Sequence, residues 1–292
     1  IHHCVGGDAN QVEDAHGITG DSVFDLTVRG TEIYMCSGDG FQLSPPREPW
    51  GDVLIEDVDF WVANLDEDAG PITAGTPIGE TAVDTKVGDG DPTPTLTMRN
   101  IRAWGFDTGH IDNMAAFNVK EDVDWTIDGV TVYDSEQAFR LRHPATVKVY
   151  NAVVYDVDTA FRLEDGLDGA RIYNSTLGGG VDQPFQDAGG DPVGLDVRNL
   201  LFMGDALPAE AADASNMATA ADVFVDAAGH DYHLVEGSAP IDAGVTLPEV
   251  TIDRVNNPRP FGDDYDVGAF EFTPGGDGDG DGDGDGDVDF SY

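Results

Sequence analysis

Five cationic side chains stand out because cations are scarce in this sequence: it has 14 Lys and Arg against 57 Asp and Glu, and a formal net charge of −43. They are Lys86, Lys120, Arg140, Arg142 and Arg162, and His143 directly follows Arg142. Brought together, side chains of this kind bind anions and stabilise negative charge that develops in a transition state. A lysine crowded by other cations also has a lowered pKa, which suits it to act as a base. Whether the five meet depends on the elements that carry them.

A short pattern repeats along the chain and predicts those elements. Each unit has a β-type run, a polar turn residue, a second β-type run, a gap and a third run. The turn residues lie mostly about 22 to 29 positions apart and are all Gly, Asn or Asp, which tolerate left-handed backbone angles. The longest step contains a Pro- and Gly-rich loop at 64–80. The turn residues are Gly30, Asp57, Asn100, Gly129, Asn151, Asn174 and Asn199.

Apolar residues occupy the same three places in each unit. Such columns at a fixed period, without helical periodicity, predict an all-β chain folded as a parallel β-helix of about seven rungs. The column before the turn residue reads Val28, Ile55, Met98, Ile127, Val149, Ile172 and Val197, and the column after it reads Ile33, Phe60, Ala103, Val132, Val154, Leu177 and Phe202. The third run supplies Phe41, Val83, Phe117, Phe139, Phe161 and Phe185.

The pattern also predicts how the chain is divided. We expect β-helix rungs over 1–204, a C-terminal cap over 205–272, an acidic Gly-Asp linker over 273–287 and the start of a following domain at 288–292. Residue 1 falls in the middle of a rung, so we expect earlier rungs and a monomer within a larger multidomain chain. "IHHCVGG" aligns with "IYMCSGD" and places Cys4 over Cys36 on neighbouring rungs. Rungs lie about 4.8 Å apart, which is compatible with a disulfide or with two free thiols.

Strand alternation places the five cations on one outer face. If the Phe of the third run points inward, the residue after it and the residue two further on point outward. Like charges about 4.8 Å apart repel by about 1 kcal/mol per pair in water, and by more at a lower dielectric. The face therefore indicates either a bound anion, such as a linear polyanion lying across the rungs, or neutralisation by nearby carboxylates as surface ion pairs. The first outward column reads Gln42, Asp84, Asn118, Arg140, Arg162 and Gln186, and the second reads Ser44, Lys86, Lys120, Arg142, Glu164 and Ala188.

The charge balance limits the partners and the setting. So acidic a chain lacks the basic footprint that nucleic acid requires. No apolar run reaches the roughly 20 residues needed for a membrane span. An Asp-rich, Lys-poor surface suits a halophilic protein in molar salt, where charge repulsion is screened to within about 3 Å. An ordinary secreted acidic protein, with calcium as a possible ligand, is the alternative. We expect a secreted or cell-surface protein.

Two sets of residues resemble known families. The repeat and the ending "DYHL…GSAPIDAG…DVGAFE" resemble the pectate-lyase-like (pectin lyase-like) superfamily, which implies a right-handed parallel β-helix. "NVKE", with Lys120, and "RLRHP", with Arg142 and His143, resemble paired motifs of β-helix alginate lyases and chondroitinase B; the Lys and Arg lie 22 residues apart, one rung. This second resemblance covers about two rungs. It implies that Lys120 is the base and that Arg142 supports the acid side and the substrate, although Pro144 replaces the family's Gly.

The resemblance also raises the question of calcium. The family places two calcium-binding acids shortly before its Lys, where this sequence has Asn113 and Ala115. Glu80 and Asp84, one rung earlier, are therefore the candidate metal ligands. A separate candidate metal or sugar site near the N-terminal end comprises His2, His3, His16, Asp39 and Gln42.

Together these observations predict a secreted polysaccharide lyase that cleaves an anionic, uronate-containing polysaccharide by β-elimination. The alternatives are a non-catalytic carbohydrate-binding or cell-surface β-helix protein and a glycoside hydrolase. A hydrolase requires two carboxylates about 5–9.5 Å apart, and Asp84 and Glu164, with cations between them, are a weaker pair for it. The candidate catalytic residues are Lys120 and Arg142, and the candidate substrate-binding residues are Lys86, Asn118, Arg140, His143 and Arg162.

Overall fold

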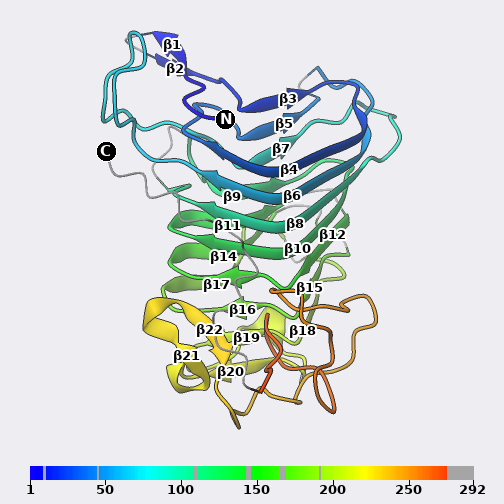
Figure 1. Ribbon diagram of the computed structural model, residues 1–292. Helices are drawn as coiled ribbons and strands as arrows, with labels where there is room; N and C mark the ends of the chain where they lie inside the picture. Colours follow the sequence, from blue (N-terminus) through cyan, green and yellow to red (C-terminus); the bar gives the residue numbers. More distant parts are fainter. Residues whose placement is uncertain are drawn as a thin grey trace.

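The computed structural model describes residues 1–8, 11–44, 46–107, 111–142, 146–164, 167, 169–190 and 192–274. Within them the chain winds into a parallel β-solenoid of about seven turns, as the repeat predicts (Figure 1). The right-handed winding stays a prediction. Residues 275–292, which include most of the expected linker and the start of a further domain, lie outside the described residues. No helix in the described part of the chain has the length and apolar character needed to cross a bilayer.

The larger sheet has eleven strands. Its first four long strands pair in parallel and in register, from β4 through β6 and β8 to β10. They are β4 (Phe24–Tyr34), β6 (Gly51–Trp61), β8 (Thr95–Trp104) and β10 (Asp124–Tyr133). In later turns the strand divides in two, giving β12 (Thr146–Tyr150), β13 (Val153–Val154), β15 (Arg171–Tyr173), β16 (Thr176–Leu177), β18 (Asp196–Arg198) and β19 (Leu201–Met203), followed by β20 (Met217–Thr219).

The seven predicted turn residues all have left-handed backbone angles, with φ from 47° at Asn174 to 71° at Gly129. Each bends its rung between two arms of the larger sheet, and the apolar columns on either side pair in the predicted register. Asn side chains also link successive turns: Asn100 Nδ2 donates to Asp57 Oδ1 at 2.9 Å. The turn residues therefore set both the bend and part of the stacking.

The second sheet has seven parallel strands and carries the cationic face. Its inward-pointing Phe side chains stack, with ring centroids 5.5 Å apart between Phe117 and Phe139 and 5.0 Å apart between Phe139 and Phe161. Together with the apolar columns of the larger sheet they form the continuous core. The strands are β3 (Ile18–Gly20), β5 (Phe41–Leu43), β7 (Val83–Thr85), β9 (Ala115–Val119), β11 (Ser135–Leu141), β14 (Val157–Leu163) and β17 (Val181–Asp187).

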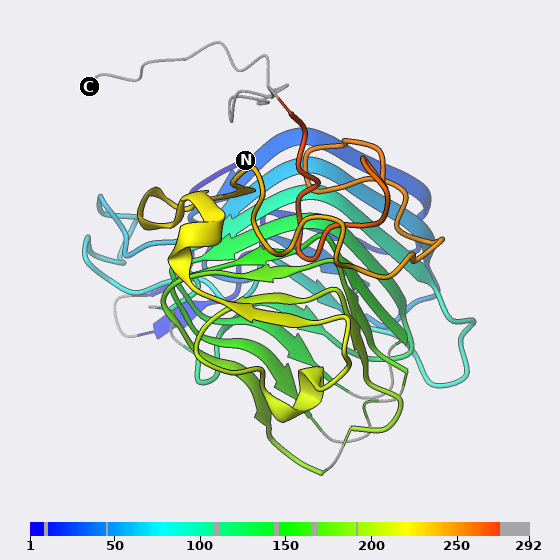
Figure 2. The same ribbon diagram turned by 90° about the horizontal axis from the view of Figure 1, so that it is seen from below.

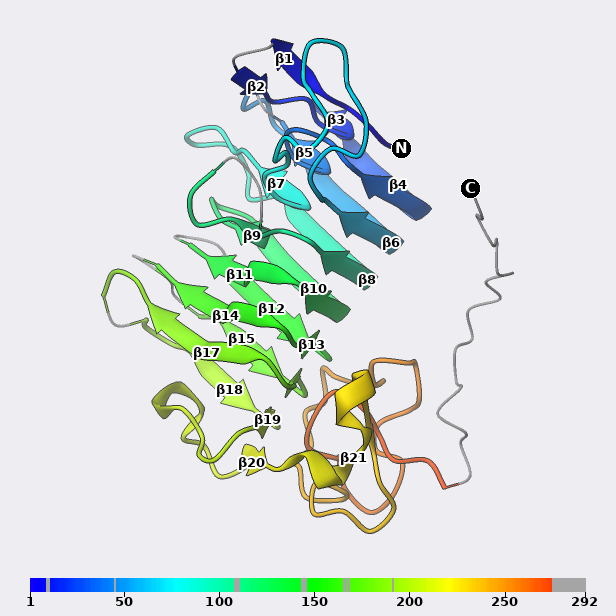
Figure 3. The same cartoon turned by 90° about the vertical axis from the view of Figure 1, so that its left-hand side faces the viewer.

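A hairpin and a long loop project from the N-terminal end of the solenoid, as Figure 3 shows above the ladder of second-sheet strands. The hairpin pairs β1 (Gly6–Asp8) with β2 (Gln11–Glu13) in antiparallel fashion, and the loop spans residues 62–80. Leu65, Ile72 and Ile78 of the loop pack with Met35, and the hairpin's Val12 contacts the same cluster. We call the hairpin and the loop together the N-terminal projection.

The C-terminal segment has two parts, although we expected a single end cap. The first part contains η1 (Ala209–Ala211), η2 (Ala221–Val223), β21 (Phe224–Asp226), η3 (Ala227–Gly229) and β22 (Asp231–Leu234), and Tyr232 packs beneath the last turns. The second part, residues 240–272, lies along the flank of the solenoid, against the column of turn residues (Figure 2). Asn199 Nδ2 donates to Val245 O at 2.8 Å, and Arg259 donates to Asn151 Oδ1 at 3.2 Å. We call residues 240–272 the strap.

Both cysteines are free thiols in this structure, Cys36 buried and Cys4 half-buried. His2 pairs with Tyr34 in a parallel bridge, so the first residues do align with the next rung as the sequence indicates. Of the two possibilities left open for Cys4 and Cys36, the structure contains the pair of free thiols.

Candidate functional site

The predicted outward columns lie in the observed register of the second sheet. Gln42 pairs with Asp84, and Arg140 pairs with Asn118 on one side and with Arg162 on the other. The second column continues each strand by one more backbone bond: Arg142 N donates to Val119 O at 2.8 Å. The five cations therefore lie on one outer face, which we call the cationic face, over β7, β9, β11 and β14.

Two lysines on neighbouring rungs share one buried carboxylate at the centre of this face. Asp84 accepts from Lys86 Nζ at 2.5 Å and from Lys120 Nζ at 2.9 Å, and Asn118 Nδ2 donates to it at 3.2 Å. The side chain of Asp84 is 5% exposed, that of Lys120 14% and that of Lys86 25%. Lys120 is thus the more desolvated lysine, yet it remains open to a ligand on the face.

The pKa values of the two lysines move in opposite directions. Burial lowers the pKa of Lys120, and the neighbouring Lys86 ammonium lowers it further, against the attraction of Asp84. Burial also opposes the charge on Lys86, but attraction and hydrogen bonding by Asp84 outweigh it, and the pKa of Lys86 is raised. The arrangement therefore favours a charged Lys86 beside a Lys120 that loses its proton more readily.

Three arginines gather around a second carboxylate one to two rungs further along. Glu164 accepts from Arg140 Nε at 2.6 Å, from Arg142 Nε at 2.7 Å and from Arg162 Nε at 2.9 Å. Burial would raise the pKa of Glu164, but hydrogen bonds from Arg140 and Arg162 outweigh it and lower the pKa. The ion pairing weighed at the sequence level is therefore present. Among the described residues, the ion pairs of the five cations are made with two carboxylates, Asp84 and Glu164.

An acidic group lies at the N-terminal end of the same face. Asp39 Oδ1 accepts from Thr81 Oγ1 at 2.7 Å, and Asp39 Oδ2 accepts from Gln42 Nε2 at 2.8 Å. Burial, followed by repulsion from Asp84 and Glu80, raises the pKa of Asp39 to about 8. Burial, with repulsion from Asp14 and Asp84, raises the pKa of Glu80 to about 7. The face thus combines carboxyls that hold protons near neutral pH with carboxylates that are ion-paired.

The separate site expected near the N-terminal end is brought together only in part. Asp39 N donates to His16 Nδ1 at 2.9 Å, and burial lowers the pKa of His16, so the imidazole is neutral and joins the acidic group with Asp39 and Gln42. His2 and His3 lie apart, stacked against or edge-on to Tyr34, and His3 contacts Asp66 at 3.1 Å. His143 lies outside the described residues.

The donor set does not favour the calcium site expected at Asp84 and Glu80. Both oxygens of Asp84 already accept from ammonium groups, which would repel a divalent cation, and Glu80 hydrogen-bonds to Asp14. Among the described residues, no group of three or more His, Cys, Asp or Glu is arranged to hold a metal ion. The chemistry considered below therefore uses only the side chains of the chain.

Two buried amide oxygens on the second sheet, Asn118 Oδ1 and Gln137 Oε1, have no hydrogen-bond partner among the residues that the structure describes. Asn118 pairs with Arg140 across the strands, and Gln137 precedes Arg140 by three residues on the same strand. Buried hydrogen-bond acceptors are normally satisfied. These two oxygens therefore form a polar floor in the middle of the face, where a ligand or water can supply the missing donors.

An aromatic ladder on the larger sheet was not predicted. It occupies the position after the second apolar column and reads Tyr34, Trp61, Trp104, Tyr133 and Tyr155, with successive ring centroids 4.4, 6.0, 5.5 and 5.0 Å apart and nearly parallel planes. Because each ring covers the face of the next, the ladder stabilises the stack and offers no open ring face to a sugar. The sequence did contain the pattern that predicts this ladder, because an aromatic residue follows each of the first five residues of the second apolar column, which begins at Ile33.

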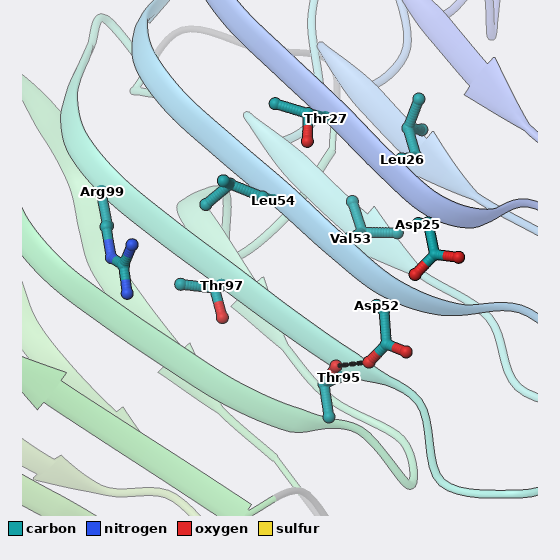
Figure 4. A pocket seen from close by; sticks show the side chains of 9 residues that line it. All are labelled: Asp25, Leu26, Thr27, Asp52, Val53, Leu54, Thr95, Thr97 and Arg99. Carbon is teal, nitrogen blue, oxygen red and sulfur yellow. Dashed lines mark hydrogen bonds between the residues drawn. The ribbon is translucent and has the colours of Figure 1, made fainter.

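A shallow depression of about 370 Å³ lies on the outer side of β4, β6 and β8, away from the cationic face (Figure 4). Its polar lining includes Asp25, Asp52 and Arg99, and Thr95 Oγ1 donates to Asp52 at 2.6 Å. None of the five cations lines this depression, so the second sheet remains the candidate site.

The fold and the face define a parallel β-solenoid with a partly neutralised cationic surface on one sheet. Neither a scan against protein-family models nor a search of curated proteins finds a match to this sequence. The functional argument therefore depends on the geometry of the face.

Proposed function

We propose that this protein is a polysaccharide lyase that cleaves an anionic, uronate-containing polysaccharide by β-elimination, with Lys120 as the base. The observation that carries the proposal is the shared carboxylate Asp84, which holds Lys86 and Lys120 side by side while their pKa values diverge. Diverging pKa values in one cluster are typical of residues with different roles in proton transfer. Lys120 lies one rung from Arg142, and the three arginines beyond it suit substrate carboxylates.

The reaction needs a base for the proton at C5 and a cation beside the adjoining carboxylate. Neutral Lys120 Nζ takes the C5 proton, the electron pair forms the C4–C5 double bond, and the C4–O4 bond breaks. The leaving oxygen takes a proton from solvent water, and the Arg142 guanidinium stabilises the negative charge that develops on it. Lys86, which stays charged, stabilises the negative charge that develops on the carboxylate. Arg140, Arg162 and the polar floor at Asn118 hold the neighbouring sugars.

Further parts of the proposal concern the setting. A secreted or cell-surface protein adapted to high salt fits a net charge of −43, because salt screens the self-repulsion that this charge creates. A monomer fits the solenoid, whose strands stack within one molecule.

A glycoside hydrolase is the second candidate, and the acidic group favours it. Asp39 and Glu80 have raised pKa values and lie in the field of the ionised, lysine-paired Asp84, so a proton donor and a carboxylate occur together. Asp84, however, is held by two lysines and is poorly placed to activate water. A binding protein without activity is the third candidate, favoured by the ion pairs to Glu164.

The test is incubation with alginate, pectate and chondroitin in high salt while the ultraviolet absorbance of the unsaturated uronate is followed. We expect absorbance to rise with one of them and to stay flat for Lys120→Ala. Lys148→Ala is the matched control, because Lys148 lies on β12 of the other sheet, and it should keep full activity. New reducing ends without absorbance would establish the hydrolase, and binding without cleavage would establish the third candidate.

A further inference from the structure

The two ends of the cationic face differ in charge. At the N-terminal end, Glu80 lies within the electrostatic field of Asp14, Asp84 and Lys86, and the Asp14 and Glu80 carboxyls hydrogen-bond to each other. No Lys or Arg occurs between residues 1 and 28 or between residues 48 and 85. Arg47, between residues 28 and 85, is held by Glu121, to which its guanidinium donates at 3.0 and 3.1 Å. At the other end, Arg140 lies on β11, Arg142 directly follows β11 and Arg162 lies on β14, while β17 carries Gln183 and Gln186 together with the exposed carboxylates Asp182 and Asp187. A polyanion laid across the rungs is therefore attracted over β11 and β14 and is repelled beyond Lys86.

The N-terminal projection adds bulk to the repulsive end. Asp14 directly follows the hairpin, and Glu80 is the last residue of the loop. The chain therefore returns from the hairpin and from the loop to the solenoid beside the cationic face. Its exposed carboxylates are Asp8, Glu13, Asp14, Asp66, Glu67 and Asp68. Figures 1 and 3 show the hairpin and the loop standing together at the N-terminal end of the solenoid.

The projection is also held in place. Gly6 N donates to Ser37 Oγ at 3.0 Å, and Ser37 Oγ donates to Glu13 O at 2.6 Å, which ties both hairpin strands to the first full rung. The neck of the loop is closed by Leu65 N to Thr76 O at 3.0 Å and Gly75 N to Leu65 O at 2.7 Å. Glu80 N donates to Gly38 O at 3.3 Å. A polymer therefore cannot pass by displacing a loose segment.

We propose that the N-terminal projection blocks the path of the polysaccharide beyond Lys86, so that the enzyme cleaves from a chain end. This inference depends on the proposed lyase function. The uronate at the reducing end of the polymer lies at Lys86 and Lys120 against Asp14 and Glu80, because elimination breaks the C4–O4 bond that joins this uronate to the next sugar. The rest of the polymer extends across Arg140, Arg142 and Arg162 toward β17. The raised pKa values of Asp39 and Glu80 are consistent with an end that disfavours further negative charge.

The salt concentration separates the steric and the electrostatic contributions of the projection to this blocking. In molar salt repulsion reaches only about 3 Å, so the carboxylates act in contact and the bulk of the projection does most of the blocking. Charge alone should matter more at low salt. The steric and electrostatic parts can thus be removed one at a time.

The experiment follows product length by size-exclusion chromatography during the first few per cent of cleavage of a long polyuronate. The first variant replaces residues 67–74 by two glycines and keeps the bonded neck. The second neutralises charge only: Asp14→Asn, Asp66→Asn, Glu67→Gln and Asp68→Asn. The matched control also removes four exposed charges, from the C-terminal segment: Asp205→Asn, Asp222→Asn, Glu236→Gln and Asp264→Asn.

For the wild type and the control we expect short products beside uncut polymer. For the shortened loop we expect fragments of intermediate length and a drop in viscosity at least several-fold faster per bond broken; the charge variant should shift the same way at low salt. Intermediate fragments from the wild type would overturn the inference while leaving the lyase in place. So would a shortened loop that keeps the wild-type thermal midpoint and still yields only short products. No unsaturated product from any polyuronate would instead refute the lyase itself.

Discussion

Lys86 and Lys120 lie on neighbouring rungs with both ammonium groups within 3 Å of Asp84, yet burial and mutual repulsion lower the pKa of one while Asp84 raises the pKa of the other. One carboxylate cannot fully compensate two ammonium groups. The more deeply placed lysine therefore releases its proton first.

Removing Lys86 tests this relationship. In Lys86→Met, Asp84 attracts Lys120 alone, so the pKa of Lys120 rises and less of it is neutral near pH 7. We expect the acidic limb of the rate profile to move to higher pH and activity at neutral pH to fall about tenfold for each unit of movement. Lys86→Arg retains the charge and should move the limb less. An unmoved limb in Lys86→Met would contradict the shared-carboxylate account.

Glu164 tests the arginine cluster. Glu164→Gln leaves three guanidinium groups without their carboxylate, and we expect the free energy of unfolding to fall by about 1–3 kcal/mol in low salt and by less in molar salt. Because its folded pKa is lowered, the contribution of Glu164 is present above its unfolded pKa, near 4.5, and is lost as the pH falls through the folded value. Denaturant titrations between pH 3 and 7 measure both effects. Asp158→Asn, at an exposed position of β14, the strand that directly precedes Glu164, is the control.

Asp39 gives the opposite dependence on pH. Its pKa is about 8 in the folded state against 3.8 for the ordinary group, so the folded protein holds a proton that the unfolded chain releases. Its contribution to stability therefore declines as the pH rises from about 4 to about 8 and is constant above that. In Asp39→Asn this part of the decline should disappear, which parallel denaturant titrations at pH 5 and pH 9 would reveal. Equal slopes in the two proteins would count against a buried, protonated Asp39.

The strap contains a buried ion pair that should be costly to break. The Arg259 side chain is fully buried and donates to Glu271 Oε1 at 2.5 Å and to Gly268 O at 2.9 Å. Arg259→Leu leaves Glu271 as an unpaired buried charge, and we expect a loss of about 3–5 kcal/mol of unfolding free energy. Arg171→Leu, which removes an exposed arginine 3.9 Å from Glu249, should cost under about 1 kcal/mol.

Salt dependence tests the adaptation to salt. With a net charge of −43, raising NaCl from 0.1 to 2 M should raise the thermal midpoint, because screening weakens the repulsion between carboxylates in the folded state. A midpoint that is flat or falls over this range would argue for the ordinary secreted acidic protein.

The repeat and most of the cationic face were predictable, because a solenoid converts sequence period directly into spatial neighbours. The turn residues, from Gly30 to Asn199, and the pairing of Arg140 with Arg162 follow from counting alone. The acidic group around Asp39 does not follow from counting, because the strand alternation is broken where it lies. In a regular strand every second side chain points inward, but Ala138 and Phe139 are consecutive and both fully buried. The direction of the preceding side chain, Gln137, therefore cannot be obtained by counting back from Phe139. The same holds for Asp39, which precedes Gly40 and Phe41.

The strap was also beyond prediction from the repeat. Its residues break the period, and nothing in a broken period says whether a segment covers the end of the solenoid or its side. The decisive contacts join residues more than a hundred positions apart, such as Arg259 with Asn151 and Arg254 with Asn100. Pairings of this range leave no periodic trace in the sequence.

The strap has a consequence for how the molecule comes apart. A stack of rungs that touch only their neighbours can fray from its end, losing one rung at a time. Here one segment contacts Asn199, Asn174, Asn151, Thr131 and Asn100, which belong to five successive rungs. The last rungs cannot detach without releasing the whole seam, so this half of the array should open as a single cooperative unit.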